Sequence, residues 1–160
     1  MDRPWYWPIG GMPEKANPFD WIVKNKMAAS WWPDNMVLKI YERENIKVII
    51  NCSEFDNKRN IPSNYSYYHI RIPDYGIPTE EQIERFLKIT DYHGKRKEAI
   101  VTHCVAGCGR TGQMIVAWAA KNNYIPKNMD PVKWIQKKRP CSLETREQME
   151  FARRIVKKIM

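Results

Sequence analysis

The sequence predicts an α/β domain, with a central and mostly parallel sheet flanked by helices. Short apolar runs rich in β-branched residues alternate along the chain with runs whose apolar residues recur at helical spacing. This alternation is typical of strands joined by helical crossovers. With 160 residues, of which 43% are apolar and 28% charged, the chain has the composition of one globular domain with a sizeable core.

The segment 1–20 differs in composition from the rest, because it combines several prolines and two adjacent glycines with Trp5, Tyr6 and Trp7. Proline at this density excludes a regular helix. We expect the segment to wrap around the single domain 1–160 with its aromatic side chains tucked in. A mobile tail is the alternative.

The next part of the chain predicts one helix and two strands. A helix is expected over 36–44. The run 46–52 is rich in β-branched residues and predicts a buried strand, while the polar residues 53–66 predict turns. Apolar and polar residues alternate over 67–72, which predicts another strand.

The second half of the chain predicts helices around one further strand. A capping box formed by Thr79 and Gln82 begins a helix that ends near residue 93. The apolar run 99–101 predicts a buried strand, and a helix-forming run follows over 113–121.

Two more helices are predicted near the C-terminus. Asp130 caps the first of them, with Pro131 at its first position, and this helix runs to about residue 138. A second capping box, formed by Thr145 and Gln148, begins the last helix. The core face of that helix consists of Met149, Ala152, Val156 and Ile159.

The stretch between the strand 99–101 and the helix 113–121 carries the chemistry, and it reads His-Cys-Val-Ala-Gly-Cys-Gly-Arg-Thr-Gly over 103–112. A strand–loop–helix turn gathers backbone N–H groups and the positive end of a helix dipole around one point, which makes an anion site. Cys104 opens this loop, where positive potential favours a thiolate. Arg110 closes it with a planar fork that can hold two phosphate oxygens. The sequence therefore predicts a nucleophile inside a phosphate-binding loop.

The order His-Cys, five residues, Arg-Thr resembles the signature of the cysteine-dependent protein tyrosine phosphatases, particularly their small dual-specificity branch. The resemblance covers most of 22–158, and residues 26–30 resemble the first strand of the family and the turn after it. It implies a protein tyrosine phosphatase-like fold and phosphate-ester hydrolysis through a phosphocysteine on Cys104. The backbone N–H groups that would bind the phosphate belong to Val105, Ala106, Gly107, Cys108, Gly109 and Arg110.

The same loop also contains the pattern G-x-G-x-x-G at 107–112, and Asp130 lies 18 residues beyond it, as in a dinucleotide-binding fingerprint. The context does not fit, because the acidic residue of that fingerprint caps a second parallel strand, whereas residues 122–128 are polar and interrupted by proline. The pattern would also leave Cys104 and Arg110 without a role. No cofactor is therefore expected.

Two Pro-Asp sequences compete for the role of general acid. Asp74 follows Pro73 in a loop flanked by prolines and lies 30 residues before Cys104, which resembles the acid loop of the family in spelling and spacing. Asp34 ends a Trp-Pro-Asp sequence, but it lies 70 residues before the cysteine. We predict that Asp74 is the acid and that Asp34 caps the helix over 36–44. The tryptophans beside Asp34 are then packing residues.

The resemblance implies further roles. Thr111 would donate a hydrogen bond to the thiolate, and His103 would organise the loop backbone. Gln148 would position the hydrolytic water, or it would serve only its capping box. Glu144 stands where relatives carry a first glutamine, and Cys141 replaces a glycine, for which the sequence offers no interpretation.

Cys52 ends the predicted strand 46–52. Some relatives keep a cysteine there that bonds the catalytic cysteine on oxidation. Cys52 is therefore either a redox partner of Cys104 or a buried inert thiol.

Composition limits the partners and the location. The net charge of +9 favours anionic partners, such as phosphorylated or acidic proteins, nucleic acid or an anionic membrane surface. A generally basic solvated surface is the alternative. Four cysteines without a signal peptide predict a reducing, cytoplasmic location, and no apolar run is long enough to span a membrane. No metal is expected, because no C-x-x-C pair occurs. A monomer is expected.

The leading functional prediction is a phosphatase of phosphotyrosine on proteins, with phosphoserine and phosphothreonine as further candidates. The basic charge leaves an RNA 5′-triphosphatase open. A phosphoinositide phosphatase of this fold would carry lysines in the loop, which has none. A catalytically inactive phosphate-binding module is disfavoured, because Cys104, Arg110 and Asp74 are all present.

Overall fold

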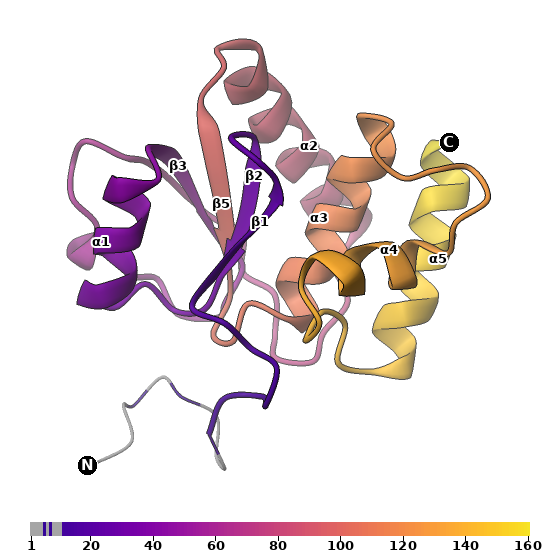
Figure 1. Ribbon diagram of the computed structural model, residues 1–160, viewed down its shortest axis with the longest axis horizontal. Helices are drawn as coiled ribbons and strands as arrows, with labels where there is room; N and C mark the ends of the chain where they lie inside the picture. Colours follow the sequence, from indigo (N-terminus) through magenta and orange to yellow (C-terminus); the bar gives the residue numbers. More distant parts are fainter. Residues whose placement is uncertain (1–4, 6, 8–10) are drawn as a thin grey trace.

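A five-stranded sheet forms the centre of the computed structural model, which describes residues 5, 7 and 11–160 (Figure 1). The strands are β1 (Phe19–Val23), β2 (Met27–Ser30), β3 (Ile46–Asn51), β4 (Ser66–His69) and β5 (Ala99–His103). Their spatial order is β1-β2-β5-β3-β4. β1 pairs antiparallel with β2, and the other pairs are parallel. The predicted fold class, α/β with a central mostly parallel sheet, is confirmed.

Helices cover both faces of this sheet (Figure 1). α1 (Asn35–Arg43) lies on one face. The other face carries α2 (Glu80–Lys95), α3 (Gly109–Lys121), α4 (Pro131–Lys138) and α5 (Arg146–Ile159). A short 3₁₀ helix covers Lys58–Asn60.

The two faces are separated by the alternation of side chains along the strands. Ile49 and Val101 pack with Val37 and Tyr41 under α1. Val48, Ile50 and Ile100 point the other way and belong to the larger core beneath α3. Strands that are buried on both faces need apolar residues at nearly every position, which explains the continuous apolar runs of β3 and β5.

α3 is the central helix of the larger core. Every residue from Gly109 to Ala120 is buried, and the helix packs against α2 and α5. β5 lies in the middle of the sheet, and only the loop 104–108 separates it from α3. The predicted phosphate-binding loop therefore lies at the carboxyl end of the central strand.

The predicted helix caps are confirmed. The Asp34 carboxylate accepts the N–H of Val37 at 3.0 Å, and Asp130 caps α4 in the same way. Both capping boxes are complete, one at Thr79 and one at Thr145. Trp32, two residues before Asp34, is buried, as expected of a packing residue.

Two predicted boundaries differ from the structure by three residues or more, and one strand was missed. β4 ends at His69 rather than at residue 72, where the chain turns toward Pro73. α3 begins at Gly109 rather than Gln113, because the glycine-rich residues 109–112 already form the first turn of the helix. β1, an edge strand over Phe19–Val23, was not predicted at all.

The N-terminal wrap lies partly outside the described residues, Tyr6 among them. Trp5 contacts the rings of Trp32 and Phe55, with centroids 5.5 and 5.2 Å away. Trp5 nevertheless stays 67% exposed, so it is not tucked in. Trp7 is half-buried, with its ring centroid 5.9 Å from that of Trp31.

Candidate active site

The loop 104–108 presents its N–H groups and hides its carbonyl groups. The carbonyl of Val105 accepts the N–H of Trp32 at 2.8 Å, and that of Cys108 accepts those of Gly112 and Leu143. Within the described part of the chain, no hydrogen bond uses the N–H groups of Val105, Ala106, Gly107 or Cys108. Consecutive buried N–H groups without an acceptor form an anion-binding nest.

Gly107 is required for this loop shape. Its φ of +75° lies in the left-handed region that favours glycine. A Cβ atom at this position would also collide with the backbone carbonyl of Ser30, at the end of β2. The loop therefore lies directly against the neighbouring strand.

Cys104 is buried beneath this nest and is held by one side-chain hydrogen bond. Thr111 donates its hydroxyl to the Cys104 sulfur at 3.1 Å. A hydroxyl in this position stabilises negative charge on the sulfur. The structure thus brings together the cysteine and the threonine that the sequence singled out.

His103 is fully buried behind the loop. Its Nδ1 lies 3.0 Å from the carbonyl oxygen of Cys104, and its ring packs edge-on against Trp32. Burial lowers the pKa of His103 to about 4. A neutral ring that donates from Nδ1 holds the backbone at Cys104, which fits an organising role rather than proton transfer.

Arg110 connects the loop to two carboxylates. Its Nη2 lies 3.3 Å from Asp74, and its Nη1 lies 3.4 Å from Glu54 and 3.0 Å from the carbonyl oxygen of Ile72. The guanidinium side chain is only 3% exposed, so it cannot turn away into solvent. The structure therefore places Asp74 beside the loop.

Sequence reasoning did not find Glu54, because it lies in a polar stretch that predicted only turns. Asn51 orders this stretch: its amide donates to the carbonyl of Phe55 at 2.7 Å and its oxygen accepts the N–H of Ser53 at 2.9 Å. An asparagine at the last position of a buried apolar strand was the available signal.

The loop that carries Asp74 is anchored by two glutamines. The carbonyl of Gly76 accepts the side-chain amides of Gln113 in α3, at 3.0 Å, and of Gln148 in α5, at 3.4 Å. The Gln148 oxygen accepts the N–H groups of Glu144 and Thr145. Gln148 therefore serves its capping box and holds the loop that carries Asp74. Water positioning by Gln148 stays a prediction.

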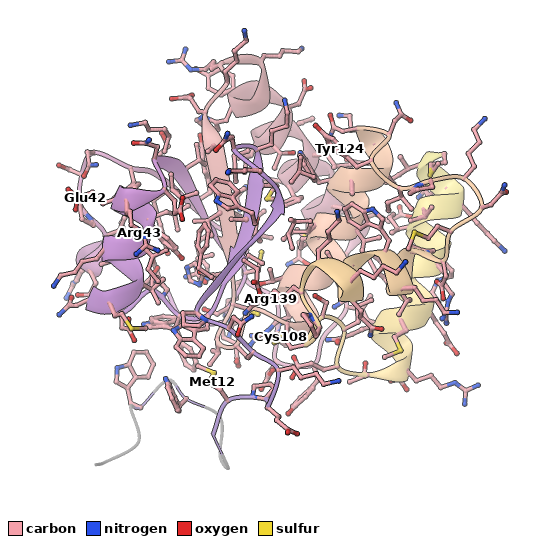
Figure 2. All side chains as sticks on the ribbon, in the orientation of Figure 1. Met12, Glu42, Arg43, Cys108, Tyr124 and Arg139 are labelled. Carbon is pink, nitrogen blue, oxygen red and sulfur yellow. A yellow bond between two sulfur atoms is a disulfide. The ribbon has the colours of Figure 1, made fainter. Side chains whose placement is uncertain are left out.

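Arg139 supports the phosphate loop from behind, and sequence reasoning missed it. Its guanidinium donates to the carbonyl oxygens of Gly107 and Ala106 at 2.8 and 2.9 Å, and it forms an ion pair with Asp20 at 2.8 Å. Burial lowers the pKa of Arg139, and Asp20 opposes this shift. Figure 2 shows Arg139 next to Cys108. In the sequence, Arg139 merely follows the predicted end of a helix at about residue 138.

A disulfide joins Cys108 in the phosphate loop to Cys141. It gives Cys141 the role that the sequence did not supply. It also departs from the reducing surroundings predicted from the cysteine content, because structural disulfides are typical of oxidising compartments. Together with the Leu143 N–H, which donates to the Cys108 carbonyl, it fastens the segment after α4 to the loop.

Cys52 and Cys104 are free and buried. The N–H of Cys52 donates to the carbonyl of His103 at 2.7 Å, so the two cysteines follow neighbouring strands. Burial, and then the neighbouring Cys104, raise the pKa of the Cys52 thiol. This places Cys52 near the candidate nucleophile and leaves its redox role a prediction.

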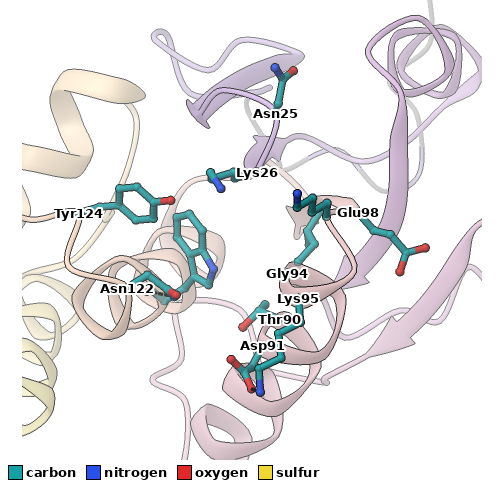
Figure 3. A pocket seen from close by; sticks show the side chains of 12 residues that line it. Asn25, Lys26, Thr90, Asp91, Gly94, Lys95, Glu98, Asn122 and Tyr124 are labelled. Carbon is teal, nitrogen blue, oxygen red and sulfur yellow. Dashed lines mark hydrogen bonds and ion pairs between the residues drawn. The ribbon is translucent and has the colours of Figure 1, made fainter.

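A separate cavity of about 500 Å³ opens at the other end of the sheet (Figure 3). It is lined by residues at the ends of α2 and α3 and at the start of β5, among them Lys26, Lys97, Trp118 and Tyr124. None of the residues of the phosphate loop lines it.

The described residues contain no group of three or more His, Cys, Asp or Glu side chains that could hold a metal ion. Nor does this part of the chain contain a helix long and apolar enough to cross a membrane.

Comparison with known proteins places residues 29–123 in one family model, described as polymorphic toxin system, DSP-PTPase phosphatase. An uncharacterised protein of Methanocaldococcus jannaschii is 34% identical over 101 residues, which cover 62% of this chain and 58% of the relative. The mouse dual specificity protein phosphatase CDC14B is 26% identical over 148 residues, which cover 81% of this chain and only 30% of the relative. This chain thus spans about three fifths of the length of the archaeal relative and less than a third of the length of the mouse phosphatase.

Among solved structures, Tk-PTP in its active form superposes with a TM-score of 0.73 at 23% identity, over 89% of this chain and 98% of that one. At this identity the similarity establishes the fold.

Proposed function

This chain belongs to the DSP-PTPase phosphatase family of polymorphic toxin systems, and from that premise we propose that it hydrolyses phosphotyrosine on proteins through a phosphocysteine intermediate. Family and fold are those of a protein phosphatase of the dual-specificity type. The observation that carries the proposal is the loop 104–108, in which four N–H groups without an acceptor surround a buried cysteine.

The proposed reaction proceeds in two steps. The Cys104 thiolate attacks phosphorus, the bond to the leaving oxygen breaks, and Asp74 gives that oxygen its proton. Loop N–H groups and Arg110 bind the other phosphate oxygens. Water then attacks the phosphocysteine, Asp74 takes the proton of that water, and the sulfur leaves with the Thr111 hydroxyl bonded to it. Phosphate and free enzyme result.

Two exposed aromatic residues support phosphotyrosine as the substrate. Phe55 directly follows Glu54, and Tyr75 directly follows Asp74, so each carboxylate that contacts Arg110 is followed by an exposed ring. An exposed ring that follows a carboxylate of the site can pack against an aromatic substrate, and ring pairs contribute about 0.5–1.5 kcal/mol beyond area burial. Phosphoserine and phosphothreonine remain further candidates.

The other functions rank lower on the same grounds. The phosphate loop carries no lysine, which weighs against inositol phospholipids, and an RNA 5′-triphosphatase rests on the charge of +9 alone. A binding module without activity would not need the contact between Thr111 and Cys104.

The wider predictions accompany this proposal. We propose that residues 1–160 form one phosphatase domain, that it acts as a monomer on phosphorylated proteins, and that its basic charge favours acidic partners. A cytoplasmic location stays a prediction, against which the disulfide between Cys108 and Cys141 weighs.

A hydrolysis panel tests the proposed function. It compares a phosphotyrosine peptide, a phosphoserine peptide, an inositol phospholipid and triphosphorylated RNA, using wild type and Cys104→Ser. We expect the phosphotyrosine peptide to have the highest kcat/KM and the variant to be inactive while still binding the peptide. Preference for any other substrate, or activity in Cys104→Ser, would contradict the proposal.

A further inference from the structure

A carboxylate of the protein itself occupies part of the anion site. Glu144 accepts the N–H of Gly109 at 3.1 Å. Gly109 follows directly on the four loop residues whose N–H groups have no acceptor in the described chain. The same row of donors therefore offers four open N–H groups and a fifth that is already bound to an internal anion.

The position of Glu144 is built rather than incidental. The Gln148 side chain accepts the Glu144 backbone N–H at 2.8 Å, which holds this residue at the start of α5. A Cβ on Gly109 would lie 2.6 Å from the Glu144 carboxylate and 2.6 Å from the Gln148 side-chain oxygen, so a larger residue there would displace both side chains. The disulfide of Cys108 and Cys141 ties the two segments together.

The charged groups around Glu144 are of both signs. Burial of its carboxylate group, and then Asp74 in the acid loop, raise the pKa of Glu144, while the Gly109 N–H and Arg110 oppose the shift. Arg110 in turn faces Glu54 and Asp74. Glu144 is an exposed residue whose carboxylate lies against the Gly109 N–H, so solvent partly screens its charge. A phosphate in the loop would add negative charge to this group of three carboxylates, and like charges at this distance repel one another.

We propose that Glu144 is a proton-linked competitor of the substrate phosphate. The ionised carboxylate binds Gly109 in the empty site. A phosphate monoester takes this N–H over, and Glu144 is released from it and takes up one proton from solvent. Glu144 thereby sets the specificity of the site: it disfavours phosphate groups of high negative charge, such as triphosphates, relative to a singly phosphorylated residue.

This inference rests on the proposed function for its biological meaning, but its test does not need turnover. Glu144→Gln removes the charge and keeps an oxygen that can accept the Gly109 N–H. Glu147→Gln is the matched control, because it removes an equal charge from the exposed first turn of α5. All binding measurements use the Cys104→Ser background with inorganic phosphate as the probe.

We expect calorimetry at about pH 8 to show roughly three- to tenfold tighter phosphate binding in Glu144→Gln, the effect of removing one partly screened like charge. Wild-type affinity should fall more steeply with rising pH than that of Glu144→Gln, since the proton uptake is lost in the variant. Phosphate itself also changes its protonation state over this pH range, but this affects both proteins equally and cancels in the comparison. Calorimetry in buffers of different ionisation enthalpy gives the number of protons taken up per phosphate bound. We expect Glu144→Gln to take up as much as one proton fewer than its parent. Glu147→Gln should behave like the parent.

Two outcomes would overturn the inference. One is equal phosphate affinity and proton uptake in Glu144→Gln and its parent. The other is an active enzyme in which Glu144→Gln lowers kcat about tenfold or more at unchanged phosphate affinity, which would assign Glu144 to hydrolysis of the intermediate. If no substrate of the panel is hydrolysed but the affinity difference is found, the proposed function fails and the competition stands.

Discussion

The guanidinium of Arg139 lies behind the phosphate loop and donates to the carbonyl oxygen of Gly107 at 2.8 Å. A second donor of the same group binds Ala106, and a third binds Asp20. One fully buried cation thus turns two loop carbonyls inward, so that the N–H groups of the loop point to the other side.

Replacing Arg139 should therefore damage both stability and phosphate binding. Arg139→Met leaves two carbonyls and Asp20 without their partner, and we expect a loss of about 3 kcal/mol in the free energy of unfolding. Arg139→Lys keeps the charge but not the fork, and should lose phosphate affinity with a smaller loss of stability. Urea unfolding and phosphate calorimetry measure the two effects. Lys137→Met, at an exposed position of α4, serves as the control and should change neither.

The disulfide between Cys108 and Cys141 closes a loop with a sequence separation of 33. We expect its reduction by a dithiol to lower stability by about 3 kcal/mol, which corresponds to a decrease in Tm of roughly 6–12 °C for a chain of this size. Activity should fall less than tenfold, because Arg139 still holds the loop. The double variant Cys108→Ser/Cys141→Ser should have the same Tm with and without reductant, and this Tm should lie below that of oxidised wild type. A wild-type Tm that does not respond to the dithiol would contradict this role.

Asp74→Asn should slow hydrolysis in proportion to the need for a proton on the leaving oxygen. For phosphotyrosine we expect a loss of about 10²–10⁴-fold in kcat, and for activated aryl phosphates a much smaller one. Asp34→Asn is the matched control, because asparagine still caps α1 and activity should not change. A strong, leaving-group-dependent loss in Asp34→Asn would identify Asp34, and not Asp74, as the general acid.

His103 makes stability depend on pH. Its pKa in the folded chain is about 4 because it is buried, whereas an unperturbed histidine titrates near 6.5. Between these values the unfolded chain binds the proton and the folded one does not, so stability falls as pH falls from about 6.5 to 4. We expect a loss of about 2 kcal/mol from this residue between pH 7 and pH 5. Urea unfolding at both pH values tests this, and an NMR titration of His103 with a midpoint near 6.5 would refute it.

Cys52 should protect Cys104 from irreversible oxidation. Peroxide converts the Cys104 thiolate to a sulfenic acid, and the Cys52 thiol then forms a disulfide with it and releases water. We expect wild type treated with mild peroxide to recover with reductant, and Cys52→Ser to lose its activity permanently at the same dose. Peptide mapping should find a crosslink between residues 52 and 104. Equal recovery of both proteins would exclude the rescue.

Much of this molecule follows from local sequence patterns. The apolar runs of β3 and β5 determine buried strands, and the caps at Asp34, Thr79, Asp130 and Thr145 determine where helices begin. These features depend on neighbours within a few residues, which is the range over which a sequence pattern can be interpreted. The succession of Cys104, Arg110 and Thr111 lies within the same range, so the strand–loop–helix turn and the contact of Thr111 with Cys104 were predictable.

Tertiary structure alone decided which distant groups surround that loop. Arg139 and Asp20 are 119 positions apart, and Glu54 and Arg110 are 56 apart. Cys141 is joined to Cys108 across 33 positions, and Glu144 reaches Gly109 across 35. The local pattern marks Glu144 and Cys141 only as departures from a motif and gives none of these residues its partner, because their roles arise only where the carboxyl ends of the parallel strands and the turn before α5 meet. Their charges and hydrogen bonds depend on burial, and burial is a property of the packed chain.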